Sequence, residues 1–227
     1  MTQSTANCPN CGAKIAFRWS ASVQTVCEYC KSILVRTDVD LRKVGQVADL
    51  PPNSSPIQLG TEGVYGPHSF VAIGRIIYEY DQGNWNEWHL MFDDGRNGWL
   101  GEAQGTYAVS FQTKVLDDLP LFDQLKVGKK VQLKGQWFEI QNLESAHCIA
   151  GDGELPFRVG AGYDAPVADL LGEKNSFATL DYSESVGEAA GAASGKPPDK
   201  MQPLVFIGEY IEFDDLHFSG LRQFDGW

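Results

Sequence analysis

Residues 70–111, FVAIGRIIYEYDQGNWNEWHLMFDDGRNGWLGEAQGTYAVSF, decide the fold because strand-forming runs alternate in them with turn residues. A period of two puts Trp88, Leu90 and Phe92 on one face of a strand and the residues between them on the other. Asp-Asp-Gly-Arg at 93–96 then supplies turn chemistry, after which the chain returns. The stretch therefore predicts a β-meander.

The runs on either side of this hairpin also have the composition of strands. Residues 70–80 are too rich in β-branched side chains for a comfortable helix, and Gly74 in their middle predicts a bend or bulge. Residues 106–111 supply the next strand, with Tyr107 and Phe111 on one face. The 24 glycines and 11 prolines favour many turns and short strands, so the predicted fold class is mainly β.

Four cysteines form two C-x2-C pairs, Cys8 with Cys11 and Cys27 with Cys30, separated by fifteen residues. This spacing is typical of a four-cysteine zinc ribbon, in which two tight turns aim four thiolates at one zinc ion at about 2.3 Å. A closed four-thiolate site leaves no open position for a substrate. We therefore expect one structural zinc per chain.

Three other uses of these cysteines are left open by the sequence. Two disulfides would require an export signal, and residues 1–7 have neither a basic start nor an apolar middle. A redox-active C-x-x-C normally occurs once, beside a βαβ pattern that is missing here. An iron–sulfur cluster is the third alternative. The spacing favours zinc over all three.

Composition divides the chain into a small module and a larger domain. The zinc ribbon is predicted at 1–45, and residues 46–57, which are punctuated by proline, serine and asparagine, form a linker. A β-rich domain of curved antiparallel sheets or small barrels follows at 58–227. Within it, residues 184–203 are rich in alanine, glycine and proline and predict a mobile loop.

The net charge of −12 is unevenly distributed along the chain. Residues 1–45 carry six Lys or Arg against three Asp or Glu, a net +3, so the remainder carries −15. That sign repels phosphate backbones and anionic lipids, which makes nucleic-acid binding by the large domain an unfavoured reading. No apolar stretch approaches the roughly 18 residues that cross a bilayer, so we expect no membrane insertion and a cytoplasmic protein.

Two parts of the larger domain echo one another. Residues 74–99 and 135–157 share a glycine, an aromatic-rich strand, a histidine and an Asp-Gly turn in the same order. Residues 205–211 also repeat the pattern of 71–77. An internal duplication would produce two small curved sheets around a pseudo-twofold axis, although β-hairpins of similar composition would look alike without one.

Seven short motifs carry a resemblance to a known bacterial family. They are CPNCG (8–12), IGR (73–75), WNEW (85–88), FDDG (92–95), GWL (98–100), GELP (153–156) and LDYS (180–183). The chain resembles the family catalogued as domain of unknown function four-one-seven-eight, in the version with an N-terminal zinc ribbon. The resemblance implies a β-rich domain in proteins associated with envelope-stress and polyamine-synthesis genes, and it supplies no catalytic residue.

The histidines form no convincing catalytic or metal site in the sequence. His147 and Cys148 are neighbours on a predicted strand and point to opposite faces, so they cannot act as a nucleophile and its base. Cys148 is more simply a buried structural residue. His89 with Asp93 or Asp94 could approach a second metal, but a third ligand at suitable spacing is missing.

Aromatic residues define a candidate binding groove. Trp85, Trp88, Glu87, Trp99 and Trp137 form the predicted set, with the acid favouring cationic ligands or basic peptide. The alternative is that these tryptophans fill hydrophobic cores.

These features favour a binding protein over an enzyme. The leading expectation is a non-enzymatic adaptor for a protein partner, with a role in bacterial envelope stress implied by the family resemblance. A polyamine-binding or polyamine-processing accessory protein is the alternative, suggested by the −15 domain and by aromatic rings that can pack against cations. Nucleic-acid binding by the +3 ribbon is a weaker third reading, because Lys14 and Arg18 point away from Phe17 and Trp19.

Overall fold

A computed structural model describes residues 4–37, 41–46, 54–80, 83–115, 119–160, 162–183 and 202–224. The fold is almost entirely β, as predicted, and its described helices are two short 3-10 turns, η1 (Phe122–Gln124) and η2 (Phe213–Leu216). No helix in the described ranges is long and apolar enough to cross a membrane. Nearly all of the loop predicted at 184–203, and most of the linker predicted at 46–57, lie outside the described residues.

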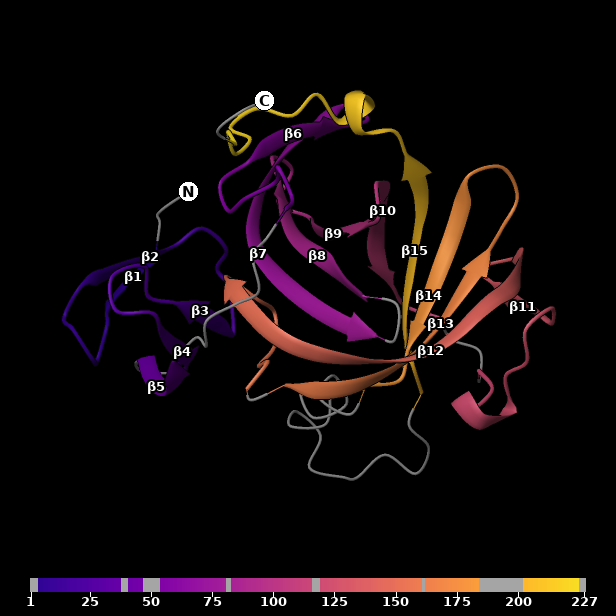
Figure 1. Cartoon of the computed structure of the whole chain (residues 1–227), viewed down its shortest axis with the longest axis horizontal. Coiled ribbons are helices and arrows are strands. Elements are labelled where there is room, and N and C mark those ends of the chain that lie inside the picture. Colours follow the sequence, from indigo (N-terminus) through magenta and orange to yellow (C-terminus); the bar gives the residue numbers. More distant parts are fainter. Residues whose placement is uncertain are drawn as a thin grey trace.

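The N-terminal module contains two small antiparallel sheets. Its strands are β1 (Ser4–Asn7), β2 (Lys14–Phe17), β3 (Gln24–Val26), β4 (Ser32–Arg36) and β5 (Leu41–Gln46). The first two strands pair with each other, and the other three form a second sheet in the order β3-β4-β5. Ile15 and Phe17 are buried and the residues between them exposed, as the predicted alternation requires. In Figure 1 the module lies beside the larger domain.

The larger domain is a closed barrel of eight antiparallel strands. They are β7 (His68–Tyr80), β8 (Gly83–Phe92), β9 (Asn97–Ala103), β10 (Thr106–Thr113), β12 (Gln136–Gly153), β13 (Tyr163–Leu171), β14 (Ser176–Asp181) and β15 (Leu204–Ile211). Around the barrel the order is β7-β8-β9-β10-β15-β14-β13-β12. The last part of the long strand β12 pairs with β7 and closes the ring (Figure 1).

The two halves of the domain repeat one arrangement. The short strands β6 (Glu62–Tyr65) and β11 (Lys130–Leu133) form equivalent hairpins with β7 and β12, and a four-strand meander follows each. The register shifts between Ala72 and Gly74 in β7 and between Ile140 and Asn142 in β12. Because β7 pairs antiparallel with β12 and β10 with β15, the halves have the pairing that a pseudo-twofold axis requires.

The strand equivalence differs from the one predicted by sequence echo. His89 lies on β8 and His147 on β12, which is the counterpart of β7, so these histidines are not equivalent. Residues 205–211 lie on β15, which corresponds to β10 and not to β7. The sequence similarity paired the wrong strands of the two halves, because Asp-Gly turns and alternating aromatic residues occur in many β-hairpins.

Two apolar clusters cover the outside of the barrel. One packs on β7 to β10 beneath η2, and its buried members are Ile57, Phe70, Ala72, Trp88, Leu90, Phe92, Leu100, Val109 and Leu216. The other packs on β12 to β15 beneath η1 and β11, with Leu133, Phe138, Ile140, Leu170 and Leu180 among its members. Successive residues of a strand point to opposite faces. Because these two clusters face outward, the residues between their members point into the lumen of the barrel.

Candidate functional site

The lumen of the barrel contains a cavity of about 290 Å³ to which all eight strands contribute. The space exists because several lumen positions carry small residues, among them Gly101, Ala108 and Ser110. A Cβ atom at Gly101 would lie 3.4 Å from a carboxylate oxygen of Glu87, which is ordinary van der Waals contact, so these two residues are neighbours on the luminal face. One end of the lumen is filled by Leu155 and Val159, both buried, which leaves the aromatic and acidic level above them open.

Five acidic residues line this cavity, and one of them, Glu102, accepts hydrogen bonds from Trp88 Nε1 (2.9 Å) and the Asn86 amide (3.0 Å). The other four are called the luminal carboxylates, and each accepts a hydrogen bond from a nearby donor: Glu87 from Trp85 Nε1 (3.1 Å), Asp169 from the Thr179 hydroxyl (3.0 Å), Asp181 from the Ser183 N–H (2.8 Å) and Glu144 from the Asn142 amide (3.2 Å). Among the described residues that line the cavity there is no Lys, Arg or His. The lumen therefore concentrates negative charge without a counter-charge.

Burial, together with repulsion from neighbouring acids at Glu87 and Asp169, raises the pKa of three of these carboxyls and so favours their neutral forms. Burial raises the pKa of Glu87 to about 7, and the charges of Asp169 and Asp181 add to the increase. Burial also raises the pKa of Asp169, with Glu144 contributing, and that of Asp181. A cation that enters the lumen would stabilise the ionised form of these carboxyls, because a nearby positive charge offsets both the desolvation and the mutual repulsion.

Aromatic rings form the rest of the cavity wall. Tyr78 and Trp85 stack with their centroids 5.0 Å apart, and Phe177 and Tyr210 lie at the same separation. Phe206 and Trp99 also line the cavity. Such rings can pack against methylene groups and hold an ammonium over a π-face.

Of the five residues predicted to line a groove, three face this lumen. Trp85, Glu87 and Trp99 line the cavity. Trp88 is 1% exposed in the outer cluster, because it alternates with Glu87 along β8 and points the other way. Trp137 is 58% exposed near the start of β12, beyond the cavity. The site is thus the inside of a closed barrel instead of a groove between two sheets.

Sequence reasoning missed the acids of the second half of the domain. Asp169 and Asp181 alternate with buried apolar residues along their strands, which is a detectable signal that they share a face. That this face meets Glu87 across a lumen depends on the closing pair β7–β12, which no local pattern encodes.

The second candidate site is the predicted four-cysteine cluster. The Sγ atoms of Cys8 and Cys30 are 3.7 Å apart, as are those of Cys11 and Cys27, and all four lie within 4.8 Å of one another. A tetrahedron with metal–sulfur bonds of about 2.3 Å has edges of about 3.8 Å. The geometry fits a four-thiolate metal site.

Matching backbone turns present these thiols. The N–H of Gly12 donates to Cys8 O at 2.8 Å, and the N–H of Lys31 donates to Cys27 O at 2.9 Å. Both residues have positive φ, 76° and 55°, a conformation that glycine adopts freely and lysine rarely. The two knuckles therefore have the same local fold, as their identical spacing predicted.

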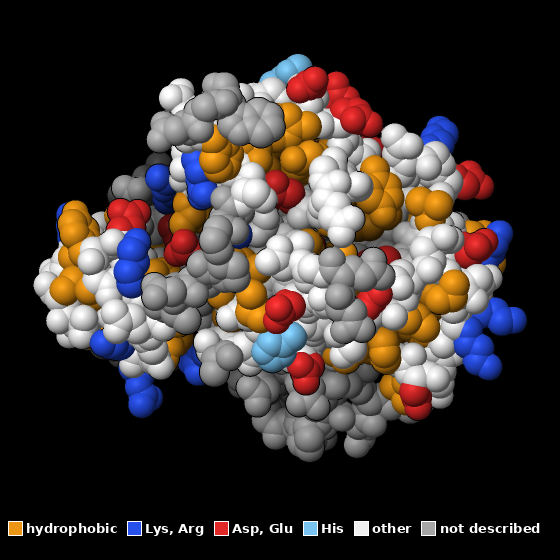
Figure 2. Space-filling view, viewed as in Figure 1, with side chains coloured by type: hydrophobic (Ala, Val, Ile, Leu, Met, Phe, Trp, Pro, Cys, Tyr) orange, Lys and Arg blue, Asp and Glu red, His pale blue; other side chains and the backbone are white. Residues whose placement is uncertain are grey.

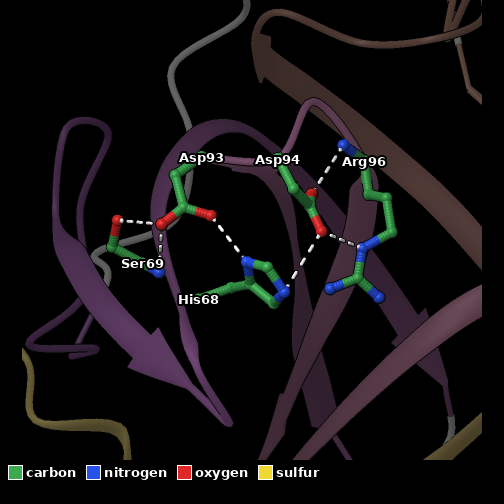
Figure 3. Close-up of polar contacts among 5 residues, drawn as sticks. All are labelled: His68, Ser69, Asp93, Asp94 and Arg96. Atoms are coloured by element: carbon green, nitrogen blue, oxygen red, sulfur yellow. Dashed lines mark hydrogen bonds and ion pairs between the residues drawn. The ribbon is translucent and has the colours of Figure 1, made fainter.

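A third cluster, at the β8–β9 turn, contains a histidine other than the one considered from sequence. His68 Nδ1 lies 2.8 Å from Asp93, and its Nε2 lies 3.5 Å from Asp94 (Figure 3). Both aspartates have lowered pKa values, Asp93 through bonds from Ser69 and Asp94 through bonds from Arg96. Because His68, Ser69 and Arg96 already interact with the two aspartates, the cluster is a turn that is held together by side-chain hydrogen bonds and ion pairs.

Two further histidines, His89 and His147, make structural contacts. His89 is fully buried, which lowers its pKa to about 4, and its Nδ1 donates to the Glu154 carbonyl at 2.9 Å. It lies with Trp99 and not with Asp93 or Asp94, so the second metal considered from sequence does not form there. His147 is exposed and pairs with Asp164, whereas Cys148 is buried, as strand alternation predicted.

Comparison with known proteins places the larger domain in a family. No curated protein and no solved structure matches the chain significantly. The model of one family, described as a domain of unknown function (DUF4178), matches residues 58–212, which include every strand of the barrel. The chain belongs to this DUF4178 family.

Proposed function

We propose that this protein is a binding protein that holds a linear organic polycation, of the polyamine type, in the lumen of its barrel. The observation that carries the proposal is the set of four luminal carboxylates without a basic partner among the described lining residues. Buried charges are normally paired, because transfer of an unpaired carboxylate from water costs several kcal/mol. A bound ammonium group would supply the missing partner.

The spacing of the acids favours an extended organic cation over a single metal ion. In the described part of the chain, two groups of three or more His, Cys, Asp or Glu bring their ligand atoms within 4.8 Å of one another, and neither contains a luminal acid. A metal ion needs such convergence. A chain of ammonium groups joined by methylenes can instead reach separated carboxylates while its methylenes contact Trp85 and Phe206.

The distribution of charge on the molecular surface also favours a cationic ligand. Lys and Arg side chains gather over the N-terminal module and at the far right of the face in Figure 2, and the centre of that face shows Asp and Glu instead. The chain after residue 45 carries −15, which raises the local concentration of cations and accelerates their association. Nucleic acid is disfavoured for the same reason.

A protein partner, the leading expectation from sequence, stays a second proposal. Tyr29 in the second knuckle is 78% exposed, so its ring is available for contact with a partner. Purification from a bacterial host should return a specific companion. A chain recovered alone under gentle conditions would contradict this adaptor role, including its proposed place in envelope stress.

We propose zinc as the metal of the cysteine cluster, one ion per chain, in a structural role. Four thiolates in a tetrahedron suit zinc best, and they leave no open position for a substrate. A reducing compartment such as the cytoplasm is part of the proposal, because there the thiols stay available for metal.

Cys11→Ser tests the metal site. The variant should lose bound zinc and the order of the N-terminal module, since metal binding supplies most of the folding free energy of so small a unit. Metal analysis and amide exchange would report both effects. Cys148→Ser is the matched control, because Cys148 lies inside the barrel and its loss should leave the zinc content unchanged. Full zinc content in Cys11→Ser would contradict the four-ligand assignment.

Tryptophan fluorescence tests the luminal site. Spermidine should change the emission of the wild-type chain, because Trp85 and Trp99 line the cavity, and the change should saturate. The response should survive physiological salt better than binding to surface charges does, since buried pairs are screened less. Alanine at Trp137, which is 58% exposed, should leave the response intact. A response lost in Trp137→Ala but kept in Trp85→Ala would place the ligand elsewhere.

A further inference from the structure

One contact between the N-terminal module and the barrel is centred on a buried carboxylate. Glu154 is 6% exposed, and its oxygens accept hydrogen bonds from the N–H of Arg18 (2.7 Å), the N–H of Trp19 (3.0 Å) and the hydroxyl of Ser22 (2.5 Å). The rest of Glu154 belongs to the barrel, because its N–H donates to Ile73 O at 2.7 Å. Three donors on one buried carboxylate make this a specific joint and not a loose contact.

The residues that follow Glu154 are paired with the module by their main chain. The N–H of Leu155 donates to Gln24 O at 2.9 Å, and the N–H of Gln24 donates back to Leu155 O at 3.1 Å. The side-chain oxygen of Gln24, which is fully buried, accepts from the N–H of Val159 at 3.0 Å. Leu155 and Val159 are therefore both hydrogen-bonded to Gln24, the first residue of β3 in the module.

This same segment forms the floor of the luminal cavity. Leu155 and Val159 fill the closed end of the lumen, and the ring of Phe157 lines the cavity itself. A file of rings runs from the module to this floor: Trp19 to His89 (4.9 Å), His89 to Trp99 (4.9 Å) and Trp99 to Phe157 (6.1 Å). Packed aromatic rings thus connect the module to the floor of the cavity.

We infer that the cysteine module is a positioning element of the luminal site, with Glu154 as the residue that couples them. The inference rests on the proposed function and assigns the module a role inside the binding site, beyond any role as a docking surface. By thermodynamic linkage the coupling is reciprocal: a ligand that needs the formed floor also stabilises the metal-bound module. Coupling of this kind typically changes affinity by about five- to 150-fold.

The joint can be tested in the full chain with Glu154→Gln. The amide group offers one acceptor fewer and turns a donor toward the N–H groups, so the floor should loosen while the cysteines keep their zinc. We expect the spermidine dissociation constant to rise about fivefold or more. Glu173→Gln is the matched control, since Glu173 is exposed and its carboxylate has no hydrogen bond among the described residues. An unchanged constant in Glu154→Gln would overturn the inference and leave the proposed function standing.

A second measurement tests the joint without any ligand. Amide exchange at Leu155 and Val159, whose N–H groups donate to Gln24, is measured in the zinc-loaded chain and after chelation of the metal. Exchange at both amides should accelerate on chelation, whereas strands on the far side of the barrel such as β14 should not change. If the exchange rates of Leu155 and Val159 were the same with and without the metal, the inference would be overturned. A wild-type chain that binds no spermidine but shows the acceleration would overturn the proposed function alone.

Discussion

Glu87→Gln is expected to make the protein more stable at pH 8 and to lower its affinity for the ligand. Glutamine keeps the oxygen that accepts from Trp85 Nε1 at 3.1 Å but removes the charge. In the wild type that charge is held in a lumen lined by four other acidic residues and by no described basic residue. Loss of a charge-assisted contact to an ammonium costs about 1.5–3 kcal/mol, so affinity should fall about tenfold or more.

The stability gain has a defined pH dependence. Burial raises the pKa of Glu87 from 4.5 to about 7, so between these values the folded chain holds a proton that the unfolded chain has lost. Stability therefore falls as the pH rises through this window, by up to about 3 kcal/mol, and the deficit is complete above it. Glu87→Gln removes the deficit, so the two proteins should melt together near pH 4 and diverge toward pH 8.

Thermal melts across this pH range, combined with titrations at pH 8, would measure both effects. Glu173→Gln should reproduce the wild type in each experiment, because Glu173 is exposed and is not among the residues that line the cavity. A variant that is less stable than the wild type at pH 8 would contradict the electrostatic description. Unchanged affinity in a stabilised variant would instead remove Glu87 from the binding site.

Trp88→Ala is expected to cause the largest loss of stability in the barrel. The side chain is 1% exposed in the outer cluster, its Nε1 donates to Glu102 at 2.9 Å, and Arg75 lies 5.2 Å from its ring. Truncation of a buried tryptophan costs about 3–5 kcal/mol, and here Glu102 and Arg75 also lose a partner. Urea or thermal unfolding measures the change directly.

Trp137→Ala provides the comparison. Because 58% of this side chain is exposed, its removal should change the free energy of unfolding by no more than about 0.5 kcal/mol. Equal losses in the two variants would mean that the burial difference between the two tryptophans is wrong. The pair thus tests whether the predicted groove residues divide between core and surface as their positions require.

Local patterns in the sequence were sufficient for the strands and for the clustering of the four cysteines. Alternation assigned Trp88, Leu90 and Phe92 to one face, and these three residues share the outer cluster. Gly74 marked the irregularity in β7, which the structure places between Ala72 and Gly74. These predictions succeeded because strand faces and cysteine knuckles depend on residues that are close in sequence.

The lumen could not be predicted in the same way. A period of two shows that Glu87 and Trp85 share a face, but it does not show whether that face is core, groove or cavity. The answer depends on the pairing of Glu79 with His147, residues far apart in sequence, which closes the barrel. Non-local pairings of this kind carry no sequence periodicity, so Asp169 and Asp181 could not be joined to Glu87 beforehand.

Calorimetric titration with spermidine at pH 7 in two buffers of different ionisation enthalpy tests the central claim most directly. An ammonium beside Glu87 lowers a pKa of about 7, so at pH 7, where that carboxyl is about half protonated, binding should release up to about half a proton per chain. We predict one saturable site with that release, reduced in Glu87→Gln. Heats that do not saturate, or a single site with no proton release, would contradict a cation-binding lumen.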